Sequence, residues 1–198
     1  MKVYFSAFSP YVRKVMVVAS ETGQTIEKLA SAASPIERDP VIVAKNPTGK
    51  VPTAILEDGA ALYDSRVITR WLDAQHHGPR MYPEGDALWT VLRREALADG
   101  LLDAALLARY ETAMRPTPFL WQDWLNGQMD KINSSLDQME AEAVEFAGVD
   151  AGLIAIGCAL GYLDFRFPDH DWRAGRAVLT GWFDEFSKRA SMVDTRPD

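Results

Sequence analysis

The first third of the chain alternates short hydrophobic segments with a segment of helical period. Residues 2–6 contain Val-Tyr-Phe, a composition that favours a strand. Ser9 and Pro10 are typical of a helix start, because a serine side chain caps the first turn and proline there needs no N–H partner. Hydrophobic residues then recur at helical spacing as far as Gly23, and residues 25–30 form a weaker candidate strand.

A β-hairpin is the clearest signal in the next part of the chain. Residues 51–57 and 60–63 flank Asp58-Gly59, a pair typical of two-residue hairpin turns. Asp64 then precedes a second helical pattern, for which it is a suitable N-terminal cap. A β-α-β segment followed by a β-β-α segment predicts a small α/β domain, with irregular chain between the two.

The remainder of the chain reads as helical. We expect a first domain over residues 1–77, a linker rich in Gly and Pro over 78–86, and an all-helical domain over 87–198. Thr117-Pro118 predicts the start of the second long helix by the same cap-then-proline pattern. Asp150 precedes a segment that is apolar on every side, which we expect to form the centre of the helical domain.

Composition and charge exclude several classes of protein. The 198 residues include 21 Lys+Arg and 28 Asp+Glu, a formal charge of −7 that argues against nonspecific binding to nucleic acid or anionic membranes. The single cysteine, Cys158, excludes an internal disulfide and a cysteine-based zinc site. The most apolar stretch, residues 151–163, is too short to span a bilayer, and no signal peptide is evident. We therefore expect a cytoplasmic protein without a metal.

Three short segments are candidates for ligand chemistry. Ser9 would lie at the positive end of a helix, where anions are stabilised, although a Ser-Pro pair taken by itself is more typical of a helix cap alone. A cis bond between Val51 and Pro52 would leave the Val51 backbone free to pair with an extended peptide, whereas the alternative is an ordinary turn. Asp64 and Ser65 could bind an ammonium and a carboxylate or merely cap a helix. Together, the three segments suit a small peptide that carries an ammonium group, a carboxylate and a reactive atom near Ser9.

These segments resemble the glutathione S-transferases, and most closely the bacterial members with an active-site serine, of the theta-like and YibF-like type. The resemblance is carried by SPYVRK at residues 9–14, NPTGKVP at 46–52 and LYDSRVI at 62–68. It extends over almost the whole chain. It implies a thioredoxin-like N-terminal domain followed by an all-helical C-terminal domain, with glutathione as co-substrate.

The resemblance also implies a role for each matching residue. Lys50 would lie near the glycine carboxylate of glutathione, and Val51 would pair with the cysteinyl part beside a cis Pro52. Asp64 and Ser65 would bind the γ-glutamyl ammonium and carboxylate.

The catalytic residue that the resemblance implies is Ser9, whose hydroxyl would donate a hydrogen bond to the glutathione sulfur and favour the thiolate. Tyr11 is the alternative donor. In a homodimer, Asp99 or Asp103 would reach the partner subunit's γ-glutamyl group. The candidate pocket for the electrophile is formed by Tyr11, Tyr110, Met114 and Trp121.

The function that follows is conjugation of glutathione to small hydrophobic electrophiles, a detoxification reaction. No cysteine lies near Ser9, which argues against relatives that form mixed disulfides. The alternatives are other glutathione chemistry, such as ether cleavage, dehalogenation or peroxide reduction. A non-catalytic member of the fold that binds a protein partner is the third possibility.

Overall fold

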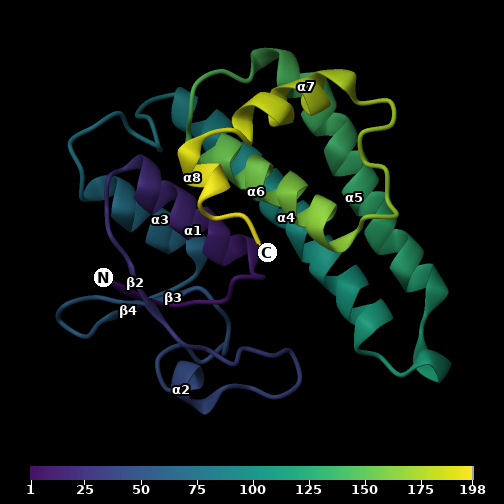
Figure 1. Cartoon of the computed structure of the whole chain (residues 1–198), viewed down its shortest axis with the longest axis horizontal. Coiled ribbons are helices and arrows are strands. Elements are labelled where there is room, and N and C mark those ends of the chain that lie inside the picture. Colours follow the sequence, from purple (N-terminus) through teal and green to yellow (C-terminus); the bar gives the residue numbers. More distant parts are fainter. Residues whose placement is uncertain (198) are drawn as a thin grey trace. The chain divides into compact units, whose positions relative to one another are not determined.

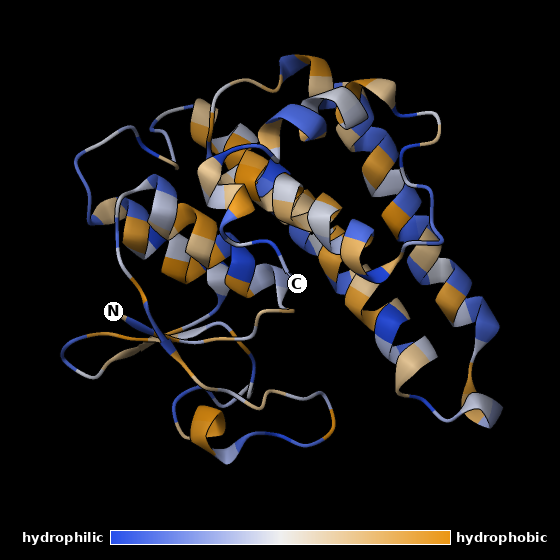
Figure 2. Cartoon of the chain, in the orientation of Figure 1, coloured by the Kyte–Doolittle hydropathy of each residue, from blue (hydrophilic) through white to orange (hydrophobic). Residues whose placement is uncertain are grey.

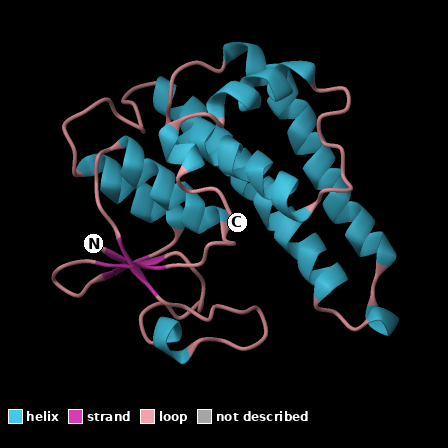
Figure 3. Cartoon of the chain, viewed as in Figure 1, coloured by secondary structure: helices cyan, strands magenta, loops and turns pink. Residues whose placement is uncertain are grey.

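The computed structural model describes residues 1–197, which form two compact units. One unit comprises Met1–Glu84 together with the C-terminal residues from Ala190 onward, and the other comprises Gly85–Arg189. Within the described residues, strands occur only in the first unit (Figure 3). The sequence had indicated a helical domain that continues to the C-terminus, whereas the last residues group with the α/β unit because they pack on its first helix.

The first unit is built on a small mixed sheet with the strand order β2-β1-β3-β4. Strands β1 and β2 are parallel, as expected for a connection through a helix, and the other neighbouring pairs are antiparallel. The predicted hairpin joins β3 to β4, with Gly59 at a φ of 85°, a conformation that favours glycine. The strands are β1 (Lys2–Tyr4), β2 (Glu27–Leu29), β3 (Thr53–Ile55) and β4 (Ala61–Leu62).

Two helices, α1 (Pro10–Glu21) and α3 (Ser65–Ala74), pack together on one side of this sheet (Figure 1). A single-turn helix, α2 (Pro40–Val43), lies on the other side. It falls in a segment that we expected to be irregular. Asp39 caps it by accepting a hydrogen bond from the Val41 N–H at 2.9 Å, so the cap-then-proline pattern was present there too, with aspartate in place of Ser or Thr.

The C-terminal helix α8 (Ala190–Val193) packs against α1 within the first unit. Ser191 Oγ donates a hydrogen bond to a Glu21 carboxylate oxygen at 2.5 Å. Helix α8 is therefore linked to α1, the helix that follows the first strand.

The second unit is entirely helical. Helix α6 is buried along nearly its whole length, in keeping with its hydrophobic sequence (Figure 2), and it packs mainly on α4. The carboxylate of Asp150 caps α6 by accepting a hydrogen bond from the Leu153 N–H at 2.8 Å, as predicted. The helices are α4 (Ala87–Ala113), α5 (Gln122–Glu142), α6 (Ala151–Arg166) and α7 (Ala177–Phe186). Short 3₁₀ turns occupy Thr117–Phe119 and Ala143–Glu145.

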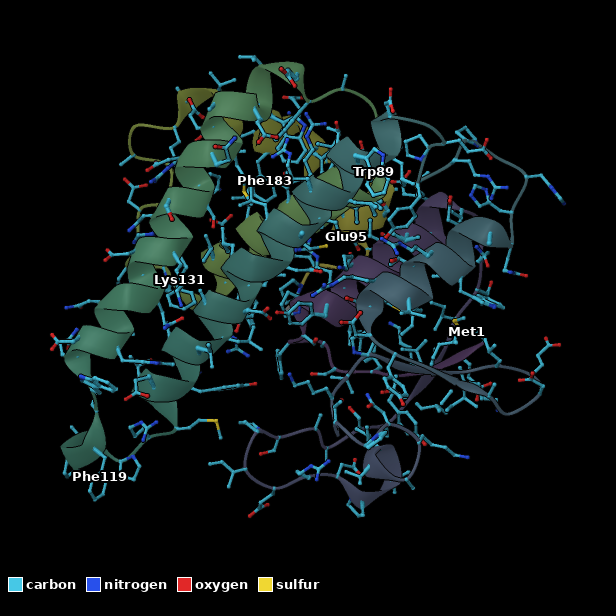
Figure 4. All side chains as sticks on the ribbon, turned by 180° about the vertical axis from the view of Figure 1, so that it is seen from behind. Met1, Trp89, Glu95, Phe119, Lys131 and Phe183 are labelled. Carbon is cyan, nitrogen blue, oxygen red and sulfur yellow. The ribbon has the colours of Figure 1, made fainter. Side chains whose placement is uncertain are left out.

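The predicted start of the second long helix was wrong. Thr117-Pro118 begins only a 3₁₀ turn, and α5 starts at Gln122 after an extended Trp121. The reason lies in α4, because the buried Glu111 carboxylate accepts the Trp121 N–H at 2.9 Å. Figure 4 shows Phe119 at the tip where α4 and α5 are joined.

Within the part of the chain that the structure describes, no helix combines the length and apolar character needed to cross a bilayer.

Candidate functional site

The strand register brings the three candidate segments to one end of the sheet. Tyr4 at the end of β1 pairs with Thr53 at the start of β3, and Ala54 pairs with Leu62 in β4. Because β3 is antiparallel to both neighbours, the carboxyl ends of β1 and β4 lie at the same edge as the amino end of β3. Ser9 follows β1, Pro52 precedes β3 and Asp64 follows β4. The sheet topology therefore supports the expectation that the three segments form one site.

Ser9 is the N-terminal cap of α1. Its backbone is extended, with φ −87° and ψ 118°, and its Oγ accepts a hydrogen bond from the Val12 N–H at 3.3 Å. Since the oxygen acts here as an acceptor, its own proton has no partner among the described residues and can be donated to a ligand. The half-buried hydroxyl also lies where the α1 dipole is most positive.

The loop before β3 is fixed by a buried asparagine. The Asn46 side-chain nitrogen donates to Thr53 Oγ1 at 2.9 Å and to the Lys50 carbonyl at 3.3 Å. Its side-chain oxygen accepts from the backbone N–H and the hydroxyl of Thr48, at 3.0 and 2.8 Å. Asn46 is only 1% exposed, so these four bonds hold the loop in a single conformation. Nothing in the sequence around Asn46, within NPTGKVP at residues 46–52, indicates this role.

In this loop, the backbone N–H and carbonyl of Val51 are available to pair with a ligand. The Val51–Pro52 peptide bond is cis, and the sheet ladder begins only at Thr53. Among the described residues, neither the N–H nor the carbonyl of Val51 has a hydrogen-bond partner. An extended peptide can add to such an edge by pairing with both groups. Lys50, immediately before it, is exposed and places a positive charge beside the same edge.

The third segment is the start of α3. Asp64 is its cap, with one carboxylate oxygen accepting from the Arg66 N–H at 3.0 Å. The other oxygen lies 3.9 Å from the Arg66 guanidinium, and the Asp64 side chain is 62% exposed. Its carboxylate is therefore available to an ammonium group. Ser65 is the first residue of the helix and is buried, at 1% exposure.

The remaining candidates belong to the second unit, except Tyr11, which lies in the first turn of α1. Asp99 is 2% exposed, whereas Asp103, one turn further along α4, is exposed. Of the two, only Asp103 presents its carboxylate at the surface of this chain. Nearer the C-terminus of α4, burial raises the pKa of Tyr110, so its phenol stays protonated at neutral pH. The side chains of Met114 and Trp121 are 40% and 63% exposed.

Glu111 is a residue that our sequence analysis missed. Its carboxylate binds both the Trp121 N–H and the Arg115 guanidinium, at 2.9 and 2.7 Å. The Trp121 hydrogen bond is the main cause of the lowered pKa of Glu111, and Arg115 adds to it. The i, i+4 spacing of Glu111 and Arg115 was a signal for the ion pair, but not for the contact with Trp121 ten residues away.

No group of three or more His, Cys, Asp or Glu residues within residues 1–197 is arranged to hold a metal ion. The candidate site itself offers the Ser9 hydroxyl and backbone N–H groups as donors, the exposed Asp64 carboxylate and the exposed Lys50 ammonium.

Comparison with known proteins identifies the class. Residues 3–80 match the N-terminal domain of the glutathione S-transferases, and residues 122–185 match their C-terminal domain. The chain is also 35% identical over 202 residues to an uncharacterized GST-like protein, YibF, of Escherichia coli (strain K12). That match covers 100% of this chain and 98% of YibF. The chain belongs to the glutathione S-transferase family and is YibF-like.

Two solved structures are similar over their whole length. A glutathione transferase family member from Pseudomonas fluorescens Pf-5, crystallised with bound glutathione, is 46% identical with a TM-score of 0.97, and the match covers 100% of this chain and 98% of that one. A glutathione S-transferase from Methylobacillus flagellatus KT, also with glutathione bound, is 35% identical with a TM-score of 0.92, covering 100% and 99%. The expected thioredoxin-like domain and all-helical domain are thereby confirmed.

Proposed function

We propose that this protein binds glutathione at the sheet edge described above and transfers its thiolate to small hydrophobic electrophiles. The observation that carries the proposal is the Ser9 hydroxyl, which caps α1 through its oxygen and keeps its proton for a ligand. The glutathione bound in the two relatives supports the choice of co-substrate.

Each end of glutathione has a matching group at the edge. The backbone of Val51 pairs with the cysteinyl residue, and the exposed Lys50 ammonium attracts the glycine carboxylate. The Asp64 carboxylate accepts hydrogen bonds from the γ-glutamyl ammonium, while the Ser65 N–H and hydroxyl at the N-terminus of α3 donate to the γ-glutamyl carboxylate. These contacts place the thiol near Ser9.

Activation of the thiol is then an electrostatic effect. The thiolate is the nucleophile, and a free thiol with a pKa of about 8.5 is only a few per cent ionised at neutral pH. A hydrogen bond from Ser9 to the sulfur, at the N-terminus of a helix, favours the charged form. Lowering the pKa by one unit requires about 1.4 kcal/mol, which is within the range of such a charged hydrogen bond.

We further propose that the protein acts as a homodimer, with Asp103 as the acid that approaches the partner subunit's glutathione. Its exposure on α4 favours it over the buried Asp99. Contacts of the electrophile with Tyr11, Tyr110, Met114 and Trp121, and a cytoplasmic detoxification role, stay predictions.

Calorimetric titration with glutathione tests the binding mode. Asparagine also caps helices, so Asp64→Asn preserves α3 while it removes the charge that binds the ammonium. We expect this variant to bind glutathione about tenfold or more weakly than the wild type, because a hydrogen bond to a charged group is worth about 1.5–3 kcal/mol. Glu57→Gln removes an exposed carboxylate from the same unit and is the matched control, with unchanged affinity.

An absence of glutathione binding by the wild type would overturn the proposed function. Equal affinities of Asp64→Asn and the wild type would reject the proposed placement of the γ-glutamyl group.

A further inference from the structure

A chain of buried hydrogen bonds joins the segment that follows α3 to the first turn of that helix. It begins at the Tyr82 hydroxyl, which lies 2.7 Å from Thr69 Oγ1. Thr69 Oγ1 in turn lies 2.8 Å from the carbonyl oxygen of Ser65. All three residues are buried, so water does not compete for these bonds. The bonds therefore connect Tyr82 to the end of α3 at which the proposed γ-glutamyl site lies.

The two contacts of Thr69 are both hydrogen bonds in only one arrangement of protons. A carbonyl oxygen accepts but never donates, so the proton of the Thr69 hydroxyl is directed to Ser65. A longer contact of 3.3 Å reaches the Arg66 carbonyl, which is likewise only an acceptor. The proton between the two hydroxyls must then come from Tyr82, whose phenol donates to Thr69. A hydroxyl that accepts one bond while it donates another is polarised, and each bond strengthens the other.

The chain of hydrogen bonds continues through a peptide group. The Ser65 carbonyl belongs to the same peptide as the Arg66 N–H, and this N–H donates to an Asp64 carboxylate oxygen at 3.0 Å. A peptide whose carbonyl accepts an additional hydrogen bond is more strongly polarised, so its N–H becomes a better donor. The hydrogen bonds thus run without interruption from the buried phenol of Tyr82 to the exposed Asp64 carboxylate.

Tyr82 is itself held in place by the C-terminal half of α3. The buried Asp73 carboxylate accepts the N–H groups of Met81 and Tyr82, at 2.7 and 3.3 Å. The Arg80 guanidinium donates to the Asp73 carbonyl. The Arg70 guanidinium lies 5.3 Å from the centre of the Tyr82 ring, within the range of a cation–π interaction. These contacts fix the backbone and the ring of Tyr82, so the direction of its hydroxyl is set before any ligand arrives.

We propose that Tyr82 and Thr69 are positioning residues for the γ-glutamyl group of glutathione. They strengthen the hydrogen bond from the Arg66 N–H to one oxygen of Asp64, which fixes the carboxylate in the orientation that receives the ligand's ammonium group. Both side chains are buried, so they act through Asp64 and do not touch the ligand. The inference rests on the proposed function, because it concerns the γ-glutamyl contact of that same site.

Calorimetric titration with two ligands separates positioning from a general effect on the fold. One ligand is glutathione, and the other is glutaryl-cysteinylglycine, which is glutathione with hydrogen in place of the α-ammonium group. We expect Tyr82→Phe and Thr69→Val each to bind glutathione about threefold to tenfold more weakly than the wild type, in keeping with the loss of one neutral hydrogen bond. Both variants should bind the glutaryl ligand as the wild type does, because it has no ammonium for Asp64 to bind.

Thr22→Val is the matched control, at the far end of α1. Thr22 Oγ1 donates to the Val18 carbonyl at 2.7 Å, so this variant removes the same kind of bond from the same unit and leaves the bonds at α3 in place. It should bind both ligands with the affinity of the wild type. Thermal melting confirms that every variant is folded at the temperature of the titration.

Combination with Asp64→Asn tests whether the effect passes through the carboxylate. Residues that act through one another give changes that do not add. We therefore expect the double variant with Asp64→Asn and Tyr82→Phe to bind glutathione as Asp64→Asn alone does. The Arg66 amide proton gives a further readout by NMR without ligand. Its resonance should move upfield in Tyr82→Phe, because its bond to Asp64 weakens, and stay in place in Thr22→Val.

Three results would overturn this inference and leave the proposed function intact. They are equal glutathione affinities of the wild type and Tyr82→Phe, equal losses of affinity for the two ligands, and additive losses in the double variant. An Arg66 amide resonance that does not move in Tyr82→Phe would likewise reject the connection to Asp64. An absence of glutathione binding by the wild type would overturn the proposed function, and this inference with it.

Discussion

The guanidinium of Arg13 donates a hydrogen bond to the backbone carbonyl of Met192 at 2.9 Å, across 179 positions of sequence. A second, longer bond of 3.4 Å reaches Thr195 Oγ1. Arg13 lies one turn after Ser9, and its own N–H bonds to the Ser9 carbonyl at 3.0 Å. The C-terminal segment therefore holds the turn of α1 that begins at the proposed catalytic residue.

Replacement of Arg13 by methionine should destabilise the first unit. Methionine fills much of the same volume but leaves the Met192 carbonyl without its buried donor, so we expect a loss of about 2–3 kcal/mol in the free energy of unfolding. Urea denaturation measures this loss. Lys45→Met, which removes an exposed charge from the same unit, should change stability little. Comparable stability of the two variants would show that the Arg13 contact is not stabilising.

Asn46 is the second residue whose loss should affect both stability and the proposed site. Asn46→Ala removes four hydrogen bonds from a buried position and leaves the Lys50 carbonyl with one donor fewer. We expect a loss of about 2–4 kcal/mol in unfolding free energy, together with weaker glutathione binding because the Val51 edge is no longer held in place. Denaturation and calorimetry measure the two effects.

Thr48→Val is the graded comparison for Asn46→Ala. It removes only the hydroxyl bond to Asn46 and keeps the backbone bond, so its effects should be clearly smaller. Equal effects of the two substitutions would contradict the central position given to Asn46.

Glu142 gives the helical unit a pH-dependent contribution to stability. Bidentate hydrogen bonds from Arg93, at 2.6 and 2.8 Å, are the main cause that lowers its pKa from 4.5 to about 2, although burial opposes the shift. A carboxyl group whose folded pKa is depressed stabilises the fold above its unfolded pKa, and this contribution is lost as the pH falls toward the folded value. The relevant window therefore lies between about pH 4.5 and pH 2.

In that window, Glu142→Gln should behave differently from the wild type. At pH 7 we expect the variant to be less stable by about 1–2 kcal/mol, a value reduced for the solvent screening of the half-exposed Arg93. The difference should shrink steadily as the pH falls from 4.5 to 2 in thermal melts. A difference that stays constant over this range would exclude charge as its origin.

Gly152 allows α6 to approach α4 closely. A Cβ atom at this position would lie 2.8 Å from both the Val91 carbonyl oxygen and the Arg94 Cβ. We therefore expect Gly152→Ala to destabilise the protein by about 1–3 kcal/mol in chemical denaturation. Gly181 in α7 has no atom within 4 Å of the corresponding Cβ position, and Gly181→Ala should stabilise by up to about 1 kcal/mol. Similar effects of the two substitutions would contradict the close approach.

The local sequence was enough to predict those elements whose boundaries are marked by a capping residue or a turn residue. Ser9-Pro10 marked the start of α1, Asp58-Gly59 marked the hairpin, and Asp64 and Asp150 capped their helices. In each case the residue acts on backbone groups within three positions of itself, so its effect can be read from a short window.

The features that the sequence did not reveal depend on distant partners. Arg13 was taken as part of a family motif, and nothing near it in the sequence indicates Met192. The start of α5 at Gln122 depends on Glu111, which lies ten residues away from the Trp121 N–H that it binds.

The most direct test of the proposed function is the pKa of the glutathione thiol in the bound state, measured by ultraviolet absorbance of the thiolate during a pH titration. For the wild type we expect a value at least about one unit below the 8.5 of a free thiol. Ser9→Ala should return it toward the free value with little change in affinity. Ser9→Gly should do the same while retaining most of the helix cap.

Tyr11→Phe and Ser20→Ala are the comparison variants in this titration. The first removes the alternative hydroxyl donor, and the second removes an exposed serine from the other end of α1. Both should keep the lowered thiol pKa. An unshifted pKa in the wild type, or a shift that survives in Ser9→Ala and disappears in Tyr11→Phe, would contradict the assignment of Ser9 as the residue that activates glutathione.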